Sequence, residues 1–359
     1  MFMIFSLFSS VIAAIVLGFI VIPKVVKVAI KKDLVAKPNH RTSHVGRIPN
    51  VGGISIFISF ILAFILSSAL GADAKIQYLL FTVLVLFFVG LYDDIMIISA
   101  KRKLIGELCG ISVMIFLGDF RLTNLHGFFG IYELSYIVSL LLTFFVTVVI
   151  INALNLIDGI DGLASGVGMI ISLFFGFYFY LVGREQLAIV AFSLLGALVP
   201  FFIYNVFAKR NKIFMGDAGA LVLGVVLAAL TISFNEVNIS PSSSYHIINA
   251  PMVSICILVL PMFDTIRVFT IRIMQKRSPF SPDKNHLHHM FLALGYNHKQ
   301  STGILLLINL IYIVIGLVFQ YMPKFFFFTV IFLSCVLWSE TLRALIKARE
   351  KEKCDEVFS

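Results

Sequence analysis

The sequence carries very little charge for its length. Charged residues make up 13% of the 359 positions, whereas apolar residues make up 60% and the mean hydropathy is +1.01. No polar stretch exceeds about thirty residues, so a large soluble domain is excluded. Apolar runs of about 18 residues or more recur along the chain, which predicts membrane-spanning helices.

Other features are absent as well. The short alternating strands of a membrane barrel are missing, and no internal repeat is found. The first apolar run lacks the charged start and small-residue cleavage site of a signal peptide, so we expect a retained helix. The four cysteines have neither CxxC nor metal-type spacing and are interpreted as packing residues. These patterns predict an all-α, polytopic membrane protein.

The apolar runs predict about eleven transmembrane helices. They form one domain, 1–342, and a cytoplasmic tail, 343–359, follows. Between the fourth and fifth runs, Asp119–Glu133 is expected to form a short hairpin outside the membrane. The predicted spans are roughly Ile4–Val26, Gly52–Leu70, Ile76–Leu91, Leu104–Gly118, Leu134–Ile151, Ser165–Val182, Leu187–Phe207, Ala218–Phe234, Pro251–Ile271, Gly303–Tyr321 and Phe325–Leu342.

Lysine and arginine predict the orientation. If the N-terminus lies outside, 24 of the 28 basic residues fall in inward-facing segments, as the positive-inside rule requires. The C-terminus then lies in the cytoplasm, and the protein is expected in the inner (cytoplasmic) membrane of the cell. The net charge of +9 marks an inner face suited to anionic lipids or phosphates, and no nucleic acid is required as a partner.

Carboxylates gather on the same predicted face. Asp73 and Asp119 are expected outside, whereas seven other aspartates lie at inner helix ends or in inner loops. A shared metal–phosphate site explains why carboxylates and basic residues occupy one face. The seven are Asp93, Asp94, Asp158, Asp161, Asp217, Asp264 and Asp283.

A polar segment separates two of the apolar runs: Asn152-Ala-Leu-Asn-Leu-Ile-Asp-Gly-Ile-Asp-Gly-Leu163. Asp158 and Asp161 are three residues apart, so a helical turn would place them on one face. Gly159 and Gly162 allow close approach of backbone or ligand. Ionisable groups at membrane depth are costly and indicate function, although a polar turn between two helices is the alternative.

Two further aspartate motifs stand at helix ends. Gly90-Leu-Tyr-Asp-Asp94 ends the third run, and Lys101–Lys103 follow it. Adjacent carboxylates repel, so at least one needs a cation, an arginine or a raised pKa. Phe214-Met-Gly-Asp-Ala-Gly219 opens the eighth run, and Asp217 there is a hard oxygen ligand suited to Mg²⁺. Ordinary helix capping is the structural alternative for both motifs.

Two inner loops carry basic residues and histidines. In the loop 277–289, Arg277, His286, His288 and His289 could bind a diphosphate through charge-assisted hydrogen bonds. A zinc site lacks cysteine partners there, and a solvated basic loop is the remaining alternative. In the connection 38–53, a lipid-phosphate site and a positive-inside anchor both suit the basic residues, which are Arg41, His44 and Arg47.

Together these motifs resemble those of the polyprenyl-phosphate N-acetylhexosamine-1-phosphate transferases. Five of them occur in that family's order between about Pro38 and Met290: PNxRxxHxxxIPxxGG, the Asp pair, NxxNxxDGxDGL, FMGDxG and PDKxHLHH. HLHH preceded by PDK resembles the bacterial enzymes that use UDP-N-acetylglucosamine. The run of consecutive histidines of the muramoyl-pentapeptide branch is absent, whereas enzymes for UDP-linked fucosamine- or quinovosamine-type sugars are close relatives.

The resemblance implies transfer of N-acetylglucosamine-1-phosphate from UDP-N-acetylglucosamine to undecaprenyl phosphate, with UMP released at the cytoplasmic face. It implies Mg²⁺, with Mn²⁺ as an alternative, held by Asn155 and Asp217. Asp93 and Asp94 are the implied catalytic pair. Arg41, His44 and Arg47 would meet the lipid phosphate, and a homodimer in the bilayer is compatible with this class. The implied substrate contacts are Asp158, Asp161, Asn205, Phe214, Arg277, His286, His288 and His289.

The chain departs from the family pattern at several positions. Ala36 and Thr42 replace an acidic and a basic residue, Ala220 replaces a serine, and Lys209–Lys212 stands where the family has a Pro-Ala turn. A transporter is the rival class, because acids at broken helix ends also suit cation sites. That class predicts repeats and polar residues at mid-membrane, whereas these acids lie at helix ends.

Overall fold

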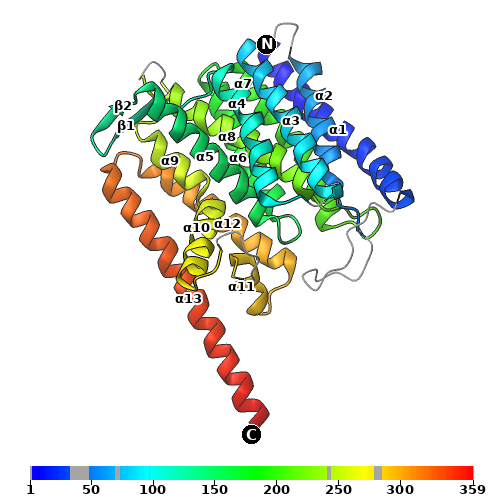
Figure 1. Cartoon of the computed structure of the whole chain (residues 1–359), viewed down its shortest axis with the longest axis vertical. Coiled ribbons are helices and arrows are strands. Elements are labelled where there is room, and N and C mark those ends of the chain that lie inside the picture. Colours follow the sequence, from blue (N-terminus) through cyan, green and yellow to red (C-terminus); the bar gives the residue numbers. More distant parts are fainter. Residues whose placement is uncertain are drawn as a thin grey trace.

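The protein is a helical bundle with one small β-hairpin, seen in a computed structural model (Figure 1). The structure describes residues 2–32, 48–68, 73–96, 98–240, 244–278 and 285–358. The predicted contacts of Arg41, His44 and Arg47, and the predicted inner position of Asp283, lie outside the described residues.

Helices make up most of the described chain. Strands β1 (Asn124–Phe128) and β2 (Ile131–Glu133) pair antiparallel, which confirms the hairpin expected there and makes the fold mostly rather than wholly helical. The helices are α1 (Phe2–Lys31), α2 (Gly52–Ser67), α3 (Ala74–Met96), α4 (Ala100–Phe116), α5 (Tyr136–Ile157), α6 (Leu163–Leu181), α7 (Glu185–Val206), α8 (Gly216–Val237), α9 (Ala250–Ile257), α10 (Val259–Met274), α11 (Leu287–Ala293), α12 (His298–Val318) and α13 (Lys324–Phe358).

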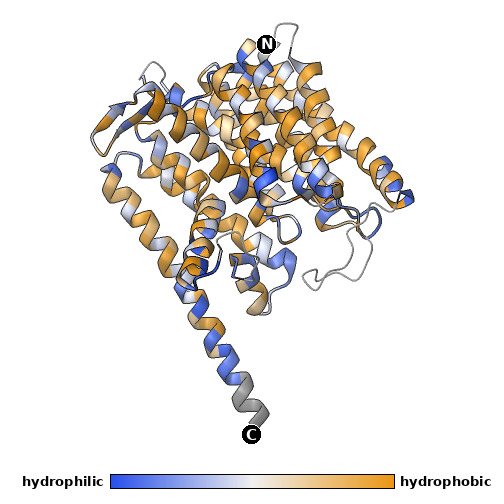
Figure 2. Ribbon diagram, in the orientation of Figure 1, coloured by the Kyte–Doolittle hydropathy of each residue, from blue (hydrophilic) through white to orange (hydrophobic). Residues whose placement is uncertain are grey.

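The described residues contain eight helices that are long and apolar enough to cross a membrane. The pair α9–α10, bent by 74°, raises this number to nine if it forms one broken span. Each of the eleven predicted ranges overlaps a helix or this pair, but α2 and α4 have only 16 and 17 residues, so the number eleven stays a prediction. The protein is nevertheless a multi-pass membrane protein, and Figure 2 shows apolar residues over most of the bundle.

The last helix runs through the predicted boundary of the membrane domain. Helix α13 has 35 residues and continues past position 342 without a break. Its far half is polar in Figure 2, as expected for a segment that leaves the membrane. The division into a membrane domain and a tail remains a prediction.

Helix α8 is the centre of the bundle. Every residue from Ala218 to Asn235 is buried, and α2, α3 and α5 pack around it. Two glycines permit this packing, because a Cβ on Gly53 or Gly90 would clash with backbone atoms at the start of α8. These glycines therefore let α2 and α3 pack closely against the start of α8, where Asp217 lies.

Two segments far apart in sequence pair through their backbones just before this point. Phe214 N–H donates to the Pro49 carbonyl at 3.0 Å, and Gly52 N–H donates to the Phe214 carbonyl at 2.8 Å. Gly53 N–H then donates to the Met215 carbonyl at 2.8 Å. This ladder fixes the start of α2 against the start of α8.

Candidate active site

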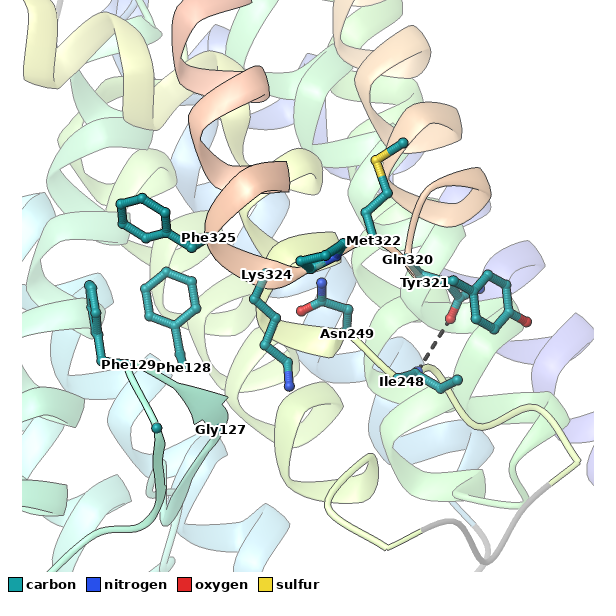
Figure 3. Close-up of a pocket in the computed structure, with 12 residues that line it drawn as sticks. Gly127, Phe128, Phe129, Ile248, Asn249, Gln320, Tyr321, Met322, Lys324 and Phe325 are labelled. Atoms are coloured by element: carbon teal, nitrogen blue, oxygen red, sulfur yellow. Dashed lines mark hydrogen bonds between the residues drawn. The ribbon is translucent and has the colours of Figure 1, made fainter.

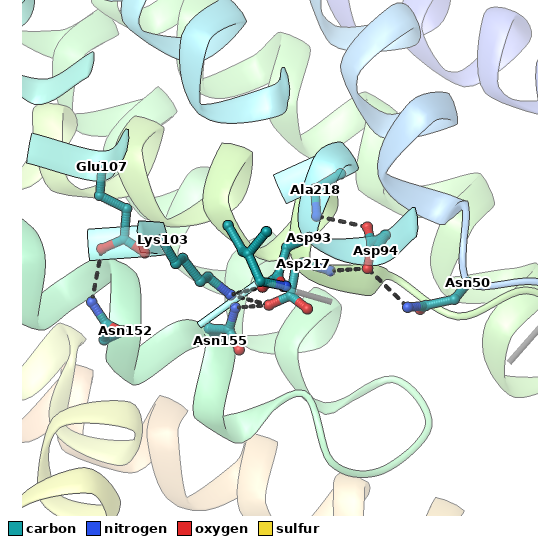
Figure 4. Close-up of polar contacts among 10 residues, drawn as sticks. Asn50, Asp93, Asp94, Lys103, Glu107, Asn152, Asn155, Asp217 and Ala218 are labelled. Carbon is teal, nitrogen blue, oxygen red and sulfur yellow. Dashed lines mark hydrogen bonds and ion pairs between the residues drawn. The ribbon is translucent and has the colours of Figure 1, made fainter. Parts of the chain in front are cut away.

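Four helix ends meet at one end of the bundle and bring the predicted aspartate motifs together (Figure 4). Asp93 and Asp94 lie in the last turn of α3, and Lys103 lies in the first turn of α4. Asn155 lies in the last turn of α5, and Asp217 lies in the first turn of α8. The amide and carboxylate groups predicted to act together are therefore neighbours in space.

One lysine ammonium bridges two of the carboxylates. Lys103 Nζ is 3.2 Å from Asp93 Oδ2, and it also donates to Asp217 Oδ1. Asn155 Nδ2 donates to the same Asp217 oxygen at 2.7 Å. The Asp93 side chain is 13% exposed and that of Asp217 is 32% exposed, so the cluster is accessible but largely shielded. A cation between two shielded carboxylates removes their mutual repulsion.

Asp94 points the other way and caps helix α8. Its Oδ1 accepts from the backbone N–H of Asp217 at 2.8 Å, and its Oδ2 accepts from that of Ala218 at 3.0 Å. Asn50 Nδ2 donates to Oδ1 at 2.9 Å. A carboxylate at a helix N-terminus is stabilised by unpaired N–H groups and by the helix dipole. The two adjacent aspartates thus have different environments. Because Asp94 caps α8, the side chain of Asp217 does not have to.

Three side chains that organise this cluster were not assigned from the sequence: Asn50, Lys103 and Glu107. Glu107 is 1% exposed, and its Oε2 accepts from Asn152 Nδ2 at 3.1 Å, which ties α4 to α5. The basic residues directly after the aspartate pair were the signal for Lys103. Asn50 lies in a quoted motif, but only the tertiary pairing of residues 49–53 with 214–215 reveals its partner.

The loop between α5 and α6 carries two further predicted site residues, Asp158 and Asp161. Asp158 is half-buried, and burial, followed by the charges of Asp217, Asp94 and Asp161, raises its pKa to about 7. Asp161 is 9% exposed, and its Oδ2 is 2.6 Å from Lys212 Nζ. Lys212 belongs to the segment where the chain departs from the family pattern, so this ion pair is a feature of that departure.

Asn205 ties two loops together. Its Oδ1 accepts from the Gly162 N–H at 2.6 Å, and its Nδ2 donates to the Ile213 carbonyl at 2.8 Å. The side chain is buried, which gives it a clear positioning role. Phe214 is half-buried, with Lys212 Nζ 5.9 Å from its ring centroid. The substrate contacts that the resemblance implied for Asn205 and Phe214 stay predictions.

A buried ion network holds the histidine loop. Asp264 Oδ2 is 2.8 Å from His286 Nδ1, and its Oδ1 accepts from the Leu287 N–H at 2.9 Å. Arg267 Nη2 lies 3.3 Å from Asp264 Oδ1 and also donates to the Asn285 carbonyl. Asp264 and Arg267 are 2% and 7% exposed, so this network anchors the loop from inside.

The histidine loop reaches the aspartate loop. His288 is buried and lies so close to Gly159 that a Cβ there would clash with the imidazole. Burial, and then the neighbouring His289, lowers the pKa of His288 to about 3, so the ring is neutral at pH 7. The His288 and His289 ring centroids are 4.3 Å apart. Arg277 is exposed after α10, with Gln275 Oε1 3.4 Å from its Nη1.

The donor chemistry of the cluster fits a hard divalent cation. The described residues contain no group of three or more His, Cys, Asp or Glu arranged to hold a metal, so neither the magnesium site nor the zinc alternative is shown. Asp93 and Asp217 nevertheless present carboxylate oxygens to a single cation, the Lys103 ammonium. Mg²⁺ prefers such oxygens and is commonly held by one or two carboxylates together with substrate phosphates.

The fold and the site define a class: a multi-pass membrane enzyme with a carboxylate–amide cluster at one end of its helix bundle. Comparison with known proteins gives the family. The model of glycosyl transferase family 4 matches residues 76–235. The chain is 31% identical over 328 residues to the undecaprenyl-phosphate alpha-N-acetylglucosaminyl 1-phosphate transferase of Yersinia pestis, covering 88% of this chain and 86% of the relative.

Two further relatives agree. The protein of the same name from Escherichia coli K12 is 32% identical over 299 residues, covering 82% of this chain and 79% of the relative. The decaprenyl-phosphate N-acetylglucosaminephosphotransferase of Mycolicibacterium smegmatis is 30% identical over 312 residues, covering 81% and 75%. The chain therefore belongs to glycosyl transferase family 4, as a polyprenyl-phosphate N-acetylhexosamine-1-phosphate transferase. This confirms the resemblance found in the motifs.

Proposed function

We propose that this enzyme transfers N-acetylglucosamine-1-phosphate from UDP-N-acetylglucosamine to undecaprenyl phosphate, as the first step of a cell-surface glycan pathway. The observation that carries the proposal is that Asp93 and Asp217 meet at one cation, Lys103, at the end of the bundle, where Asn155 donates to Asp217. The names of the relatives and the HLHH motif support the sugar. The same reaction with another UDP-N-acetyl-hexosamine is the second candidate.

In the proposed reaction, an oxygen of the lipid phosphate attacks the β-phosphorus of the nucleotide sugar. The bond from that phosphorus to the oxygen bridging the two phosphates breaks, and UMP leaves with the bridging oxygen. Phosphoryl transfer depends mainly on positioning and charge neutralisation. Asp93 would position the lipid phosphate and accept its proton, whereas Asp94 would hold the start of α8 so that Asp217 keeps its place.

Mg²⁺ bound by Asp217 and Asn155 would supply the positive charge that neutralises the diphosphate. The Lys103 ammonium, which pairs with both carboxylates here, would be able to turn to a phosphate oxygen of the substrate. The buried His288 and the loop residues Asp158 and Asp161 would shape the pocket for the nucleotide and sugar. Arg277, His286 and His289 would contribute to substrate binding from the loop 277–289, which also carries His288.

We further propose that this site faces the cytoplasm and that the N-terminus lies outside. The support is the sorting of lysine and arginine, since 24 of the 28 lie in segments that this orientation places inside. Substituted-cysteine labelling in intact cells tests the orientation. A cysteine introduced at Lys351 must react only after permeabilisation, and one at Tyr132 must react without it.

The decisive experiment supplies membranes containing the enzyme with undecaprenyl phosphate, Mg²⁺ and a panel of radiolabelled UDP-sugars. We expect lipid-linked product from UDP-N-acetylglucosamine, and loss of product on chelation that Mg²⁺ or Mn²⁺ restores. Product only from a fucosamine- or quinovosamine-type donor would support the second candidate. No lipid product from any UDP-N-acetyl-hexosamine would contradict the proposal.

A further inference from the structure

A pocket lies beside the β1–β2 hairpin, and Figure 3 shows the residues that line it. Its volume is about 670 Å³, and it is lined by the β1–β2 hairpin, residues 248–249 and the connection between α12 and α13. Helix α12 begins beside Asp161, where Thr302 Oγ1 donates to the Asp161 carbonyl, and it ends at this pocket. The pocket therefore has no part in the candidate active site.

A buried amide faces this pocket with its hydrogen bonds unused. Asn249 is 1% exposed, and neither its Nδ2 nor its Oδ1 has a partner among the described residues. Asn238, equally buried at the same end, donates to the Phe234 carbonyl and accepts from the Ile247 N–H. Buried amides are normally paired, so Asn249 requires a group that can both donate and accept. A hydroxyl has this property.

A lysine beside this amide gives the pocket its charge. Figure 3 shows the Lys324 side chain next to Asn249, and its Nζ donates to the His126 carbonyl. An ammonium has three N–H groups, so two remain for a ligand once this bond is made within the described part of the chain. No Asp or Glu is among the residues that line the pocket. The lining therefore favours an anion.

Aromatic rings form the outer wall. Phe129 stands edge-on to Phe128 with ring centroids 4.5 Å apart, and it lies 6.5 Å from the Phe325 ring. Phe129 and His126 both have positive φ, which costs energy in a residue with a side chain and is maintained by the surrounding structure. Tyrosine is enriched at the lipid–water interface, and Tyr132 on the hairpin and Tyr321 in the pocket lining are both exposed. These residues suit a position near lipid headgroups.

We propose that this pocket binds the headgroup of an anionic, hydroxyl-bearing phospholipid of the phosphatidylglycerol type. Its phosphate would pair with Lys324, and a headgroup hydroxyl would satisfy Asn249. Its acyl chains would follow the exposed apolar face of α13, which includes Phe326 and Leu333. The pocket is thereby a lipid site distinct from the one that receives the polyprenyl substrate.

The test measures lipid binding to the full-length protein in non-ionic detergent by native mass spectrometry, together with thermal unfolding. Short-chain phosphatidylglycerol should bind and raise the unfolding temperature, and phosphatidylcholine of the same chain length should not. Lys324→Gln and Asn249→Ala should each weaken phosphatidylglycerol binding by about tenfold or more, because each removes a hydrogen bond or charge contact. Both variants should keep transferase activity, which verifies folding.

A matched control is available at the same end of the molecule. Lys75 Nζ donates to the Asp119 carbonyl as Lys324 does to that of His126, but Lys75 does not line the pocket. Lys75→Gln should leave lipid binding unchanged. Three results would overturn the proposal: equal binding of phosphatidylcholine, equal binding by Lys324→Gln, or equal binding of free glycerol 1-phosphate, which would remove the need for a lipid. A fourth such result is unchanged binding by Asn249→Ala, because the proposal requires a headgroup hydroxyl to bind this amide.

Discussion

The cluster around Lys103 and the network around Asp264 are both built from carboxylates and cations, yet they differ in what they leave available. In the Asp264 network both carboxylate oxygens have partners, and Asp264 is 2% exposed. In the Lys103 cluster a single ammonium holds Asp93 and Asp217, and Asp217 is 32% exposed. The buried network fixes a loop, whereas the more exposed Asp217 makes the Lys103 cluster the place where we propose that a metal or substrate replaces the ammonium.

The largest effect on stability should come from breaking the buried network. Asp264→Ala leaves the buried Arg267 without its carboxylate, and loss of one partner of a buried ion pair typically costs about 3–5 kcal/mol. The free energy of unfolding in detergent measures this loss. Asp119→Asn is the control: it removes the charge that pairs with Arg121 at the exposed surface, keeps a side chain that tolerates the positive φ of this position, and should cost at most about 1 kcal/mol. Equal losses would remove the distinction between the two regions.

The cluster should behave in the opposite way. Asp217→Asn keeps the shape of the side chain but removes its charge, so transferase activity should fall by about 10²–10³-fold, corresponding to about 3–4 kcal/mol in the transition state. Unfolding should change by about 1 kcal/mol or less, because the side chain is partly exposed. Asp93→Asn should act similarly in the same membrane assay. Full activity in either variant would contradict the assignment of this cluster as the active site.

The histidine loop should report on pH. The folded-state pKa of His288 lies below its ordinary value of 6.5, so the unfolded chain takes up a proton first as the pH falls. Stability is therefore present above pH 6.5 and is lost toward pH 3, by about 2 kcal/mol at pH 5. His289, Asp264, His286 and His298 are the charged or titratable neighbours. Thermal unfolding at pH 7.5 and 5 measures the loss, and His288→Gln should reduce it by that amount; an unchanged pH profile would contradict it.

The smallest effect separates the two adjacent aspartates. Asp94→Ala removes the cap of α8 and should cost about 1–2 kcal/mol of stability together with some activity, because Asp217 loses its support. Asp94→Asn retains a hydrogen-bond acceptor and should recover much of the stability. Asp93→Asn is the comparison for each measurement. If Asp94→Ala were as stable as the parent and as inactive as Asp93→Asn, the division of roles between the two residues would be wrong.

The sequence predicted the class of fold and much of the site. Long apolar runs must form helices in a bilayer, because no water is present there to hydrogen-bond a free backbone, so the helices could be expected. The hairpin was expected separately, in the segment between two of these runs. The family resemblance carried by the motifs also implied that Asp93, Asn155 and Asp217 act together, and the structure brings these three residues together. The roles that the resemblance implied for the remaining site residues stay predictions, including those of Arg41, His44 and Arg47.

What the sequence could not supply was the direction of each side chain. Asp93 and Asp94 are adjacent, but successive residues on a helix point about 100° apart. Which of them meets the cation and which caps α8 depends on how α3 packs against a helix more than a hundred residues later. The hydrogen bonds of Asn205 and Asp264 are likewise made with residues that are distant in the sequence. Only the folded structure shows that the buried amide of Asn249 lacks such partners among the described residues. Local chemistry therefore determined the membrane class and the residue types of the site, and the packing of helices α3, α5 and α8 decided which groups are free to react.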